Sequence, residues 1–195
     1  MKKKITITII CAVLSCVCLI GTTFAWLVDK TDPVKNTFTV GNVDITLTET
    51  KGTEVTAGKE YEFKMVPGND IAKDPKVTVV AGSEACYVFV KIEKSANFDT
   101  FMEYALADGW VQLKDNSNVD VTGVFYRTVD ATTAESGAKY NVLNGDKVTV
   151  KNTVTKGDMD GLDDASKYPT LTFTAYAVQS DNVADAYTAW THAIA

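Results

Sequence analysis

The sequence from residue 171 to residue 176 is Leu-Thr-Phe-Thr-Ala-Tyr, which places Leu171, Phe173 and Ala175 at alternate positions. The same period of two recurs over residues 43–48 and 88–93. Because successive side chains of a strand point to opposite faces of a sheet, this alternation predicts strands with one buried face. Weaker patterns of the same kind predict strands over residues 61–65, 77–80, 119–129 and 147–151.

Turn sequences separate these segments. Examples are Pro67-Gly68-Asn69-Asp70, Ala81-Gly82 and Asn144-Gly145-Asp146. The pattern predicts an all-β fold, a jelly-roll-like β-sandwich of about eight strands. In the first strand Phe38 and Val40 are even-numbered, whereas Val43 and the apolar residues after it are odd-numbered. A regular strand would point the two sets to opposite faces, so we expect a bulge at residues 41–42 that keeps both sets on one core face.

Two apolar stripes with helical spacing interrupt the strand pattern. Apolar residues at i, i+3, i+4, i+7 and i+8 predict a helix over residues 98–106, capped by Asn97. A second stripe, which follows Ser180-Asp181, predicts a helix over residues 183–194. We expect both helices to cover edges or ends of the sandwich.

The overall composition is that of a globular protein. Of 195 residues, 46% are apolar and 23% are charged. The chain carries 25 acidic and 19 basic residues, a net charge of -6. Such a balance offers no basic surface for a phosphate backbone and argues against nucleic acid as a partner. No motif indicates a cofactor or a small-molecule substrate.

The first 25 residues have the composition of a secretory signal peptide. Three lysines, Lys2 to Lys4, precede an apolar run over residues 5–20, and small residues follow up to Ala25. We predict cleavage by a signal peptidase after Ala25, which makes Trp26 the first residue of the mature chain. Two alternatives remain at this stage: lipid attachment at Cys16, and retention of the run as an uncleaved anchor.

Removal of residues 1–25 changes the charge and the cysteine content. Three lysines and no acids are lost, so 16 basic residues face 25 acidic ones, a net charge of -9. Cys86 is then the only cysteine, and no intramolecular disulfide can form. We divide the chain into a signal peptide (1–25), an N-terminal segment (26–35) and one domain (36–195).

The sequence offers few catalytic groups. His192 is the only histidine, which excludes an HExxH zinc helix and any site that needs two histidine ligands. A Cys86–His192 pair is arithmetically available, but a lone cysteine in front of a strand is typical of a small buried apolar residue. No glycine-rich phosphate-binding loop is present.

One acidic segment is a weak candidate for calcium. Four carboxylates surround Gly161 within seven residues, and their spacing differs from that of an EF-hand. The alternative is a solvated loop or a helix start, where acidic side chains favour the positive end of the dipole. The four candidate ligands are Asp158, Asp160, Asp163 and Asp164.

Several of these segments together resemble the TasA/camelysin family of exported proteins. The N-terminal part is the most specific, because Thr23-Phe24-Ala25-Trp26 is similar to the family's Thr-x-Ala-aromatic cleavage site. The middle part, from about residue 115 to 156, matches no motif of the family. The matching segments, in order, are 21–29, 36–41, 43–47, Pro67-Gly68 with Ile71, Lys73 and Pro75, 87–92 and 171–179.

The resemblance implies a jelly-roll domain of a Gram-positive surface or biofilm matrix. In the best-known branch it implies fibres, a homopolymer built by donor-strand exchange, with a minor nucleating or anchoring protein as a further expected partner. Camelysin has been described as a zinc protease, and a chain with one histidine does not support that activity. We therefore predict that the protein is not an enzyme.

The donor segment follows from the position of proline. Pro33 cannot donate to a ladder, so a strand before Asn36 must end ahead of it. We predict a donor strand formed by Trp26, Leu27, Val28, Asp29 and Lys30, with residues 31–35 as the joint. The alternative function is a monomeric secreted or surface-associated accessory or adhesive domain, whose N-terminal segment folds back onto its own sheet.

Overall fold

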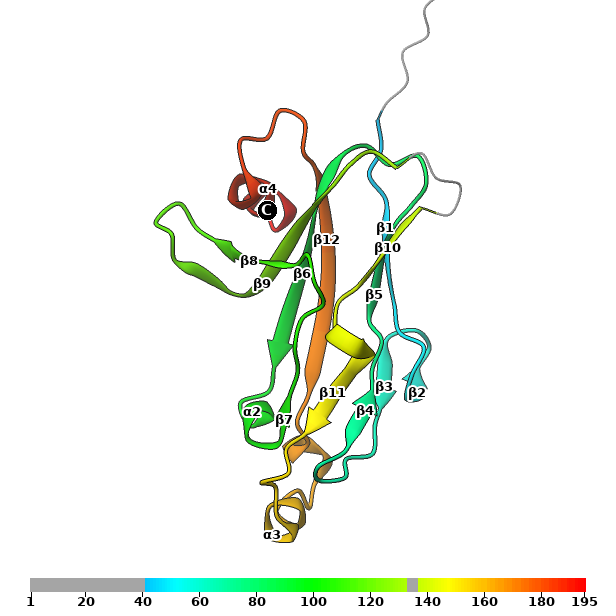
Figure 1. Ribbon diagram of the computed structural model, residues 1–195, viewed down its shortest axis with the longest axis vertical. Helices are drawn as coiled ribbons and strands as arrows, with labels where there is room; N and C mark the ends of the chain where they lie inside the picture. The colour runs from blue at the N-terminus through cyan, green and yellow to red at the C-terminus, as the bar shows by residue number, and fades with distance from the viewer. Residues whose placement is uncertain (1–40, 133–136) are drawn as a thin grey trace, which may run out of the picture. The chain divides into compact units, whose positions relative to one another are not determined.

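The computed structural model describes residues 41–132 and 137–195 (Figure 1). One compact unit spans Val40–Ala195. The helical segments described are α2 (Phe98–Phe101), α3 (Lys156–Asp160), α4 (Ala186–Ala193) and the 3-10 turns η1 (Asn144–Asp146) and η2 (Ala165–Lys167). The strands are β1 (Ile45–Thr48), β2 (Thr53–Thr56), β3 (Glu60–Glu62), β4 (Asp70–Ala72), β5 (Lys76–Val79), β6 (Cys86–Lys94), β7 (Met102–Glu103), β8 (Val111–Lys114), β9 (Asp120–Val129), β10 (Ala138–Asn141), β11 (Lys147–Val150) and β12 (Leu171–Gln179).

A four-stranded antiparallel sheet, in the order β12-β6-β9-β8, forms one layer of the unit. β12 pairs with β6 over its whole length, from Leu171 opposite Lys94 to Gln179 opposite Cys86. Val90 points to the interior of the sandwich and Phe89 to the other face, yet both are fully buried. β6 is therefore a central strand that is covered on both faces.

The second layer consists of two three-stranded antiparallel sheets, β1-β5-β10 and β4-β11-β7. The chain passes from β4 to β5, and from β10 to β11, within a few residues, so the two sheets follow one another along the strands (Figure 1). β2 and β3 form a separate hairpin. The predicted turns are confirmed at Gly68, Gly82 and Gly145, which all have positive φ angles.

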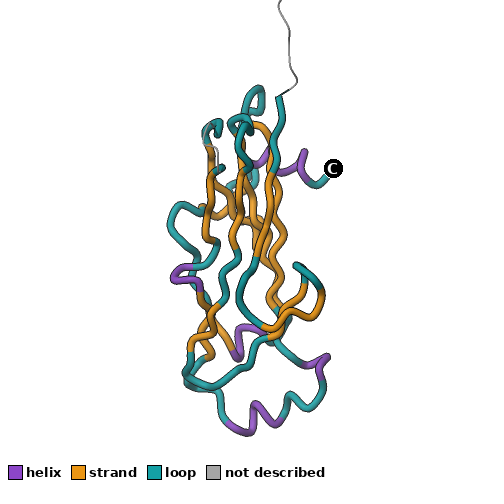
Figure 2. The backbone as a smooth tube through the Cα atoms, turned by 90° about the vertical axis from the view of Figure 1, so that its right-hand side faces the viewer, coloured by secondary structure: helices purple, strands orange, loops and turns teal. Residues whose placement is uncertain are grey.

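The main core lies between the two layers. Val77 and Val79 of β5 pack against Val88 and Val90 of β6, and none of the four is exposed. Strand segments run side by side through the unit, with the helical segments outside them (Figure 2). The prediction of an all-β sandwich is confirmed, whereas its jelly-roll connectivity stays a prediction. The predicted bulge depends on Phe38 and Val40, which lie outside the described residues.

The helix predicted over residues 98–106 is wrong beyond its first turn. α2 ends at Phe101, and Met102 starts β7, which pairs with Val150. The Asn97 side chain makes no cap hydrogen bond and instead donates to the carbonyl of Lys167. Leu106 forms a bridge with Leu143. Phe98, Phe101 and Met102 are buried in this arrangement, whereas Leu106 is half-buried and Ala105 is exposed. Pairing of β7 with β11 therefore takes the place of the second and third helical turns.

The C-terminal helix α4 confirms the second helix prediction. Asp185 caps it by accepting a hydrogen bond from the backbone N–H of Thr188 at 2.7 Å. Trp190 packs on Phe89 and Tyr176, with ring centroids 5.4 and 5.1 Å apart. α4 therefore covers the outer face of the four-stranded sheet rather than an edge. In the described ranges, no helix has the length and apolar character needed to cross a membrane.

Candidate assembly edge

Within the described part of the chain, β12 is an edge strand without the usual protection. Among the described strands it pairs only with β6. Its nine residues, Leu171–Gln179, include neither a charged residue nor a proline. Natural edge strands commonly carry lysine, proline or a bulge, because an open edge can pair with another chain. The free side of β12 is therefore suited to strand addition.

The direction of the backbone hydrogen bonds defines which groups this edge offers. The carbonyl of Thr170 accepts from the N–H of Ser95 at 3.0 Å, and the N–H of Ser180 donates to the carbonyl of Ala85 at 2.9 Å. Because bonding direction alternates along an antiparallel strand, the even-numbered residues of β12 bond to β6. The N–H and C=O groups that point to the free side belong to Leu171, Phe173, Ala175, Ala177 and Gln179.

β1 lies beside β12 but belongs to the other layer (Figure 1). It pairs with β5, and the carbonyl of Asp44 accepts from the N–H of Val80 at 2.9 Å, so Ile45 and Leu47 direct their backbone groups away from β5. Their side chains, like that of Phe173, reach the core but are only half-buried. The core is thus less covered along the β1–β12 side than at its centre.

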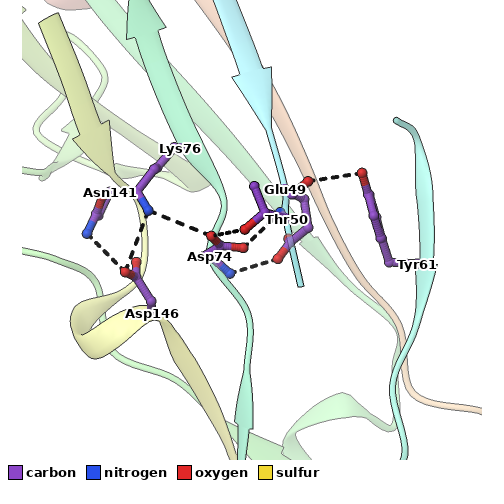
Figure 3. Close-up of polar contacts among 7 residues, drawn as sticks. All are labelled: Glu49, Thr50, Tyr61, Asp74, Lys76, Asn141 and Asp146. Atoms are coloured by element: carbon purple, nitrogen blue, oxygen red, sulfur yellow. Dashed lines mark hydrogen bonds and ion pairs between the residues drawn. The ribbon is translucent and has the colours of Figure 1, made fainter. Parts of the chain in front are cut away.

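A polar network holds the end of β1 (Figure 3). Glu49 accepts hydrogen bonds from the backbone N–H of Asp74 at 2.7 Å and from Nζ of Lys73 at 2.9 Å. The hydroxyl of Tyr61 donates to the carbonyl of Glu49 at 3.0 Å. Burial raises the pKa of Glu49, although Lys73 acts in the opposite direction. These contacts fix the end of β1 to the β4–β5 junction and to the β2–β3 hairpin.

Asp74 is the second centre of this network and is only 5% exposed. It accepts from the backbone N–H of Thr50 at 2.9 Å and from the Thr50 hydroxyl at 2.6 Å. Burial acts to raise the pKa of Asp74, but the hydrogen bonds from Thr50 outweigh it, and the pKa is lowered. Nζ of Lys76 lies 3.7 Å from Asp74 and 3.8 Å from Asp146, which also accepts from Asn141 at 3.3 Å (Figure 3). The network therefore connects β1, β5 and β10.

Lys73 links this network to the free edge. Its Nζ lies 5.3 Å from the ring centroid of Phe173 in β12 and 4.8 Å from that of Phe63. The ammonium group is thus held by one carboxylate and two aromatic faces. Lys73 therefore lies at one end of the gap between β1 and β12, the end next to the β2–β3 hairpin.

The predicted assembly and cleavage residues are not part of this geometry. Ala25 and residues 26–30 lie outside the described residues. The polar network, by contrast, was missed by the sequence analysis. Glu49 and Thr50 are 24 residues from Lys73 and Asp74, and no local pattern signals a pairing at that separation.

The four acidic residues of the calcium candidate each have a local partner. Asp158 forms a capping box with Thr155, and Asp164 accepts from the N–H of Ser166 at 2.8 Å. Asp160 pairs with Lys156 at 2.7 Å, and Asp163 pairs with Lys167 at 2.6 Å. Within residues 41–132 and 137–195, no three His, Cys, Asp or Glu side chains gather as metal ligands would. Asp158 and Asp164 lie at helix starts, whereas Asp160 ends α3 and Asp163 lies in the exposed loop that follows. The geometry therefore favours the alternative of a solvated loop with helix starts.

The comparison with protein families concerns the part of the chain that contains β1 to β5. Residues 1–82 match the camelysin metallo-endopeptidase family. This match confirms the predicted TasA/camelysin resemblance, and it covers the N-terminal 82 of 195 residues. No curated protein matches the chain.

The name of the matched family implies a catalytic metal, and the residues present can be tested against it. A catalytic zinc site uses three protein ligands, of which histidine is the commonest. His192 is the only histidine of the sequence and is exposed near the end of α4. The residues that the structure describes therefore do not fit the zinc shell of a metallo-endopeptidase.

Proposed function

We propose that this chain is a secreted structural subunit of an extracellular matrix or cell surface. In this proposal, residues 26–30 of one copy add as a strand to the free side of β12 in the next copy. The observation that carries it is the edge of β12, which has nine uncharged residues and no proline. The match of residues 1–82 to the camelysin family supports the same reading.

The donor segment has the composition that this edge requires. In an extended segment, Trp26 and Val28 would point into the half-covered core beside Phe173, and Leu27 would point outward. Two buried anchors contribute about 3 to 6 kcal/mol before the cost of ordering the segment. Such a modest gain makes assembly dependent on protein concentration and favours a nucleating partner.

The proposed role is not catalytic. It agrees with the single histidine and with the separate local partners of the acidic residues. Purified mature protein should show no chelator-sensitive peptide cleavage. Cleavage that survives repurification, together with stoichiometric zinc, would make the protein an enzyme after all.

The experiment that tests the edge uses two neighbouring substitutions in β12. Ala175→Pro removes an N–H from the free side, a position where edge strands tolerate proline. Thr174→Pro removes an N–H that bonds to β6 and should destabilise the fold. We expect Ala175→Pro to stay folded by circular dichroism and to lose fibre formation in electron microscopy, whereas Thr174→Pro loses the fold.

A second experiment tests the donor. Deletion of residues 26–30 should leave a folded monomer, and a synthetic peptide of these residues should cap growing ends. If the deleted protein polymerises as well as the mature chain, or if the mature chain stays monomeric at every concentration, donor-strand assembly is wrong. The accessory-domain alternative then takes its place.

A further inference from the structure

Arg127 is the only arginine of the chain. It lies in β9 between Phe125 and Val129, which both pack on the main core, so its side chain starts on the interior face of the sheet. Its Cζ atom lies 3.8 Å from the ring centroid of Tyr140 and 5.4 Å from that of Trp110. The guanidinium is therefore stacked on aromatic side chains from outside its own strand.

Two neighbouring residues, Gly109 and Trp110, leave room for this guanidinium and hold an aromatic ring next to it. Gly109 has a φ angle of +88°, and a Cβ atom there would lie 2.7 Å from Nη2 of Arg127. The indole N–H of Trp110 donates to the carbonyl of Asn141 at 2.8 Å, which fixes the ring next to β10. The positive φ angle favours glycine at residue 109, and a side chain there would have to move the guanidinium from its present place.

No carboxylate compensates this charge within residues 41–132 and 137–195. Their ion pairs include eight lysines and do not include Arg127. Nε of Arg127 is buried without a hydrogen-bond partner. Stacking occupies the face of a guanidinium and leaves its in-plane N–H groups available. Nε is enclosed but Arg127 as a whole is only half-buried, so we take the two Nη atoms as the end that another molecule can reach.

We propose that Arg127 is a binding site for a carboxylate carried by a second copy of this chain. A planar carboxylate can accept from both Nη atoms, the geometry that guanidinium groups bind best. A second copy can supply this carboxylate, because each mature chain has 25 acidic residues against 16 basic ones and so carries carboxylates that its own cations do not match. This contact is independent of donor-strand assembly, since β6 lies between β9, which carries Arg127, and the free side of β12.

The sole arginine provides its own spectroscopic reporter. We would record the Nε–Hε resonance of the ¹⁵N-labelled mature chain carrying Trp26→Ser and Val28→Ser, which removes the proposed donor anchors. Raising the protein concentration should shift this resonance, because more Arg127 side chains bind a neighbouring copy. Added acetate competes as a carboxylate, so in its presence the resonance should no longer change with protein concentration. This measurement is unaffected if the donor-strand proposal fails, because the variant lacks the two side chains that would anchor the donor strand.

Variants then test the chemistry by sedimentation velocity. Arg127→Lys keeps the charge but loses the fork, and should weaken self-association at least about ten-fold. Lys139→Gln, an exposed position of β10, is the matched control and should change it little. A resonance that responds to neither protein nor acetate would overturn the site. A response to acetate alone would overturn the second copy as its occupant.

Discussion

Nζ of Lys73 lies 2.9 Å from Oε2 of Glu49, and the two side chains are only 13% and 10% exposed. This pair joins the end of an edge strand, β1, to the junction between β4 and β5. The same ammonium group faces Phe173 of β12. One shielded ion pair therefore helps to hold β1 and β12 in place beside each other at the candidate assembly edge.

Removing one partner of this pair should be costly. Lys73→Met leaves Glu49 shielded and without its cation, and we expect a loss of about 3 to 5 kcal/mol in the free energy of unfolding. Glu49→Gln combined with Lys73→Met should be less destabilised than Lys73→Met alone. Urea denaturation measures both, and Lys147→Met, which breaks an exposed pair with Asp70, is the control. Equal effects of Lys73→Met and Lys147→Met would contradict the role of the shielded pair.

The acid stability of the fold should depend on Asp74. Its lowered pKa means that its stabilising contribution is complete above the ordinary aspartate pKa of about 3.9 and is lost as the pH falls through the folded-state value. We expect Asp74→Asn to be less stable than the unsubstituted protein at neutral pH and to lose less stability on acidification. Urea titrations at a series of pH values check this. Parallel pH profiles would show that Asp74 is not a source of the dependence.

Glu49 should change the pH dependence of stability in the opposite direction to Asp74. Burial raises its pKa, so the stability linked to it is present below the ordinary glutamate pKa of about 4.3 and declines as the pH rises through the folded-state value. In Glu49→Gln this gain on acidification is absent, and stability should fall more steeply from pH 6 to about pH 4. A shallower fall in the same titration would contradict the raised pKa.

Cys86 should be chemically inert in the folded protein. It is fully buried, and burial raises the pKa of its thiol to about 11. Because the thiolate is the reactive species, a disulfide reagent at about pH 8 should not modify the native mature chain. Reaction in urea serves as the positive control. Rapid modification without denaturant would show that β6 opens at its start.

The acidic segment before η2 should not respond to calcium. Each of its four carboxylates already has a local partner, and within residues 41–132 and 137–195 the four do not gather into one ligand set. We expect an unchanged melting temperature in millimolar calcium. A rise that disappears in Asp160→Ala would establish the site instead.

Export should produce a mature chain that begins at Trp26. N-terminal sequencing of the secreted protein checks this directly. A membrane-retained product that keeps Lys2 to Lys4, or a lipid on Cys16, would replace cleavage after Ala25 with one of the two alternatives.

Local patterns were sufficient for most of the strands. The period of two in residues 43–47, 88–92 and 171–176 predicts β1, β6 and β12, because a sandwich buries one face of each strand and the sequence must alternate accordingly. The stripe that ends in Trp190 predicts α4 for the corresponding reason, since a surface helix buries one side. These features depend on neighbours within a few residues.

Long-range relations were decided by the tertiary structure. Residues 98–106 have helical spacing, yet the chain leaves the helix after Phe101 because β7 pairs with β11, nearly 50 residues later. The contacts of Glu49 with Lys73 and of Arg127 with Tyr140 also join residues far apart in the sequence, so no local pattern predicts them. Which strand remains unpaired is likewise not contained in any strand's own sequence. An alternating segment becomes a central strand or an open edge only when the order of strands assigns its neighbours. Among the strands that the structure describes, that order makes β6 central and leaves one side of β12 free.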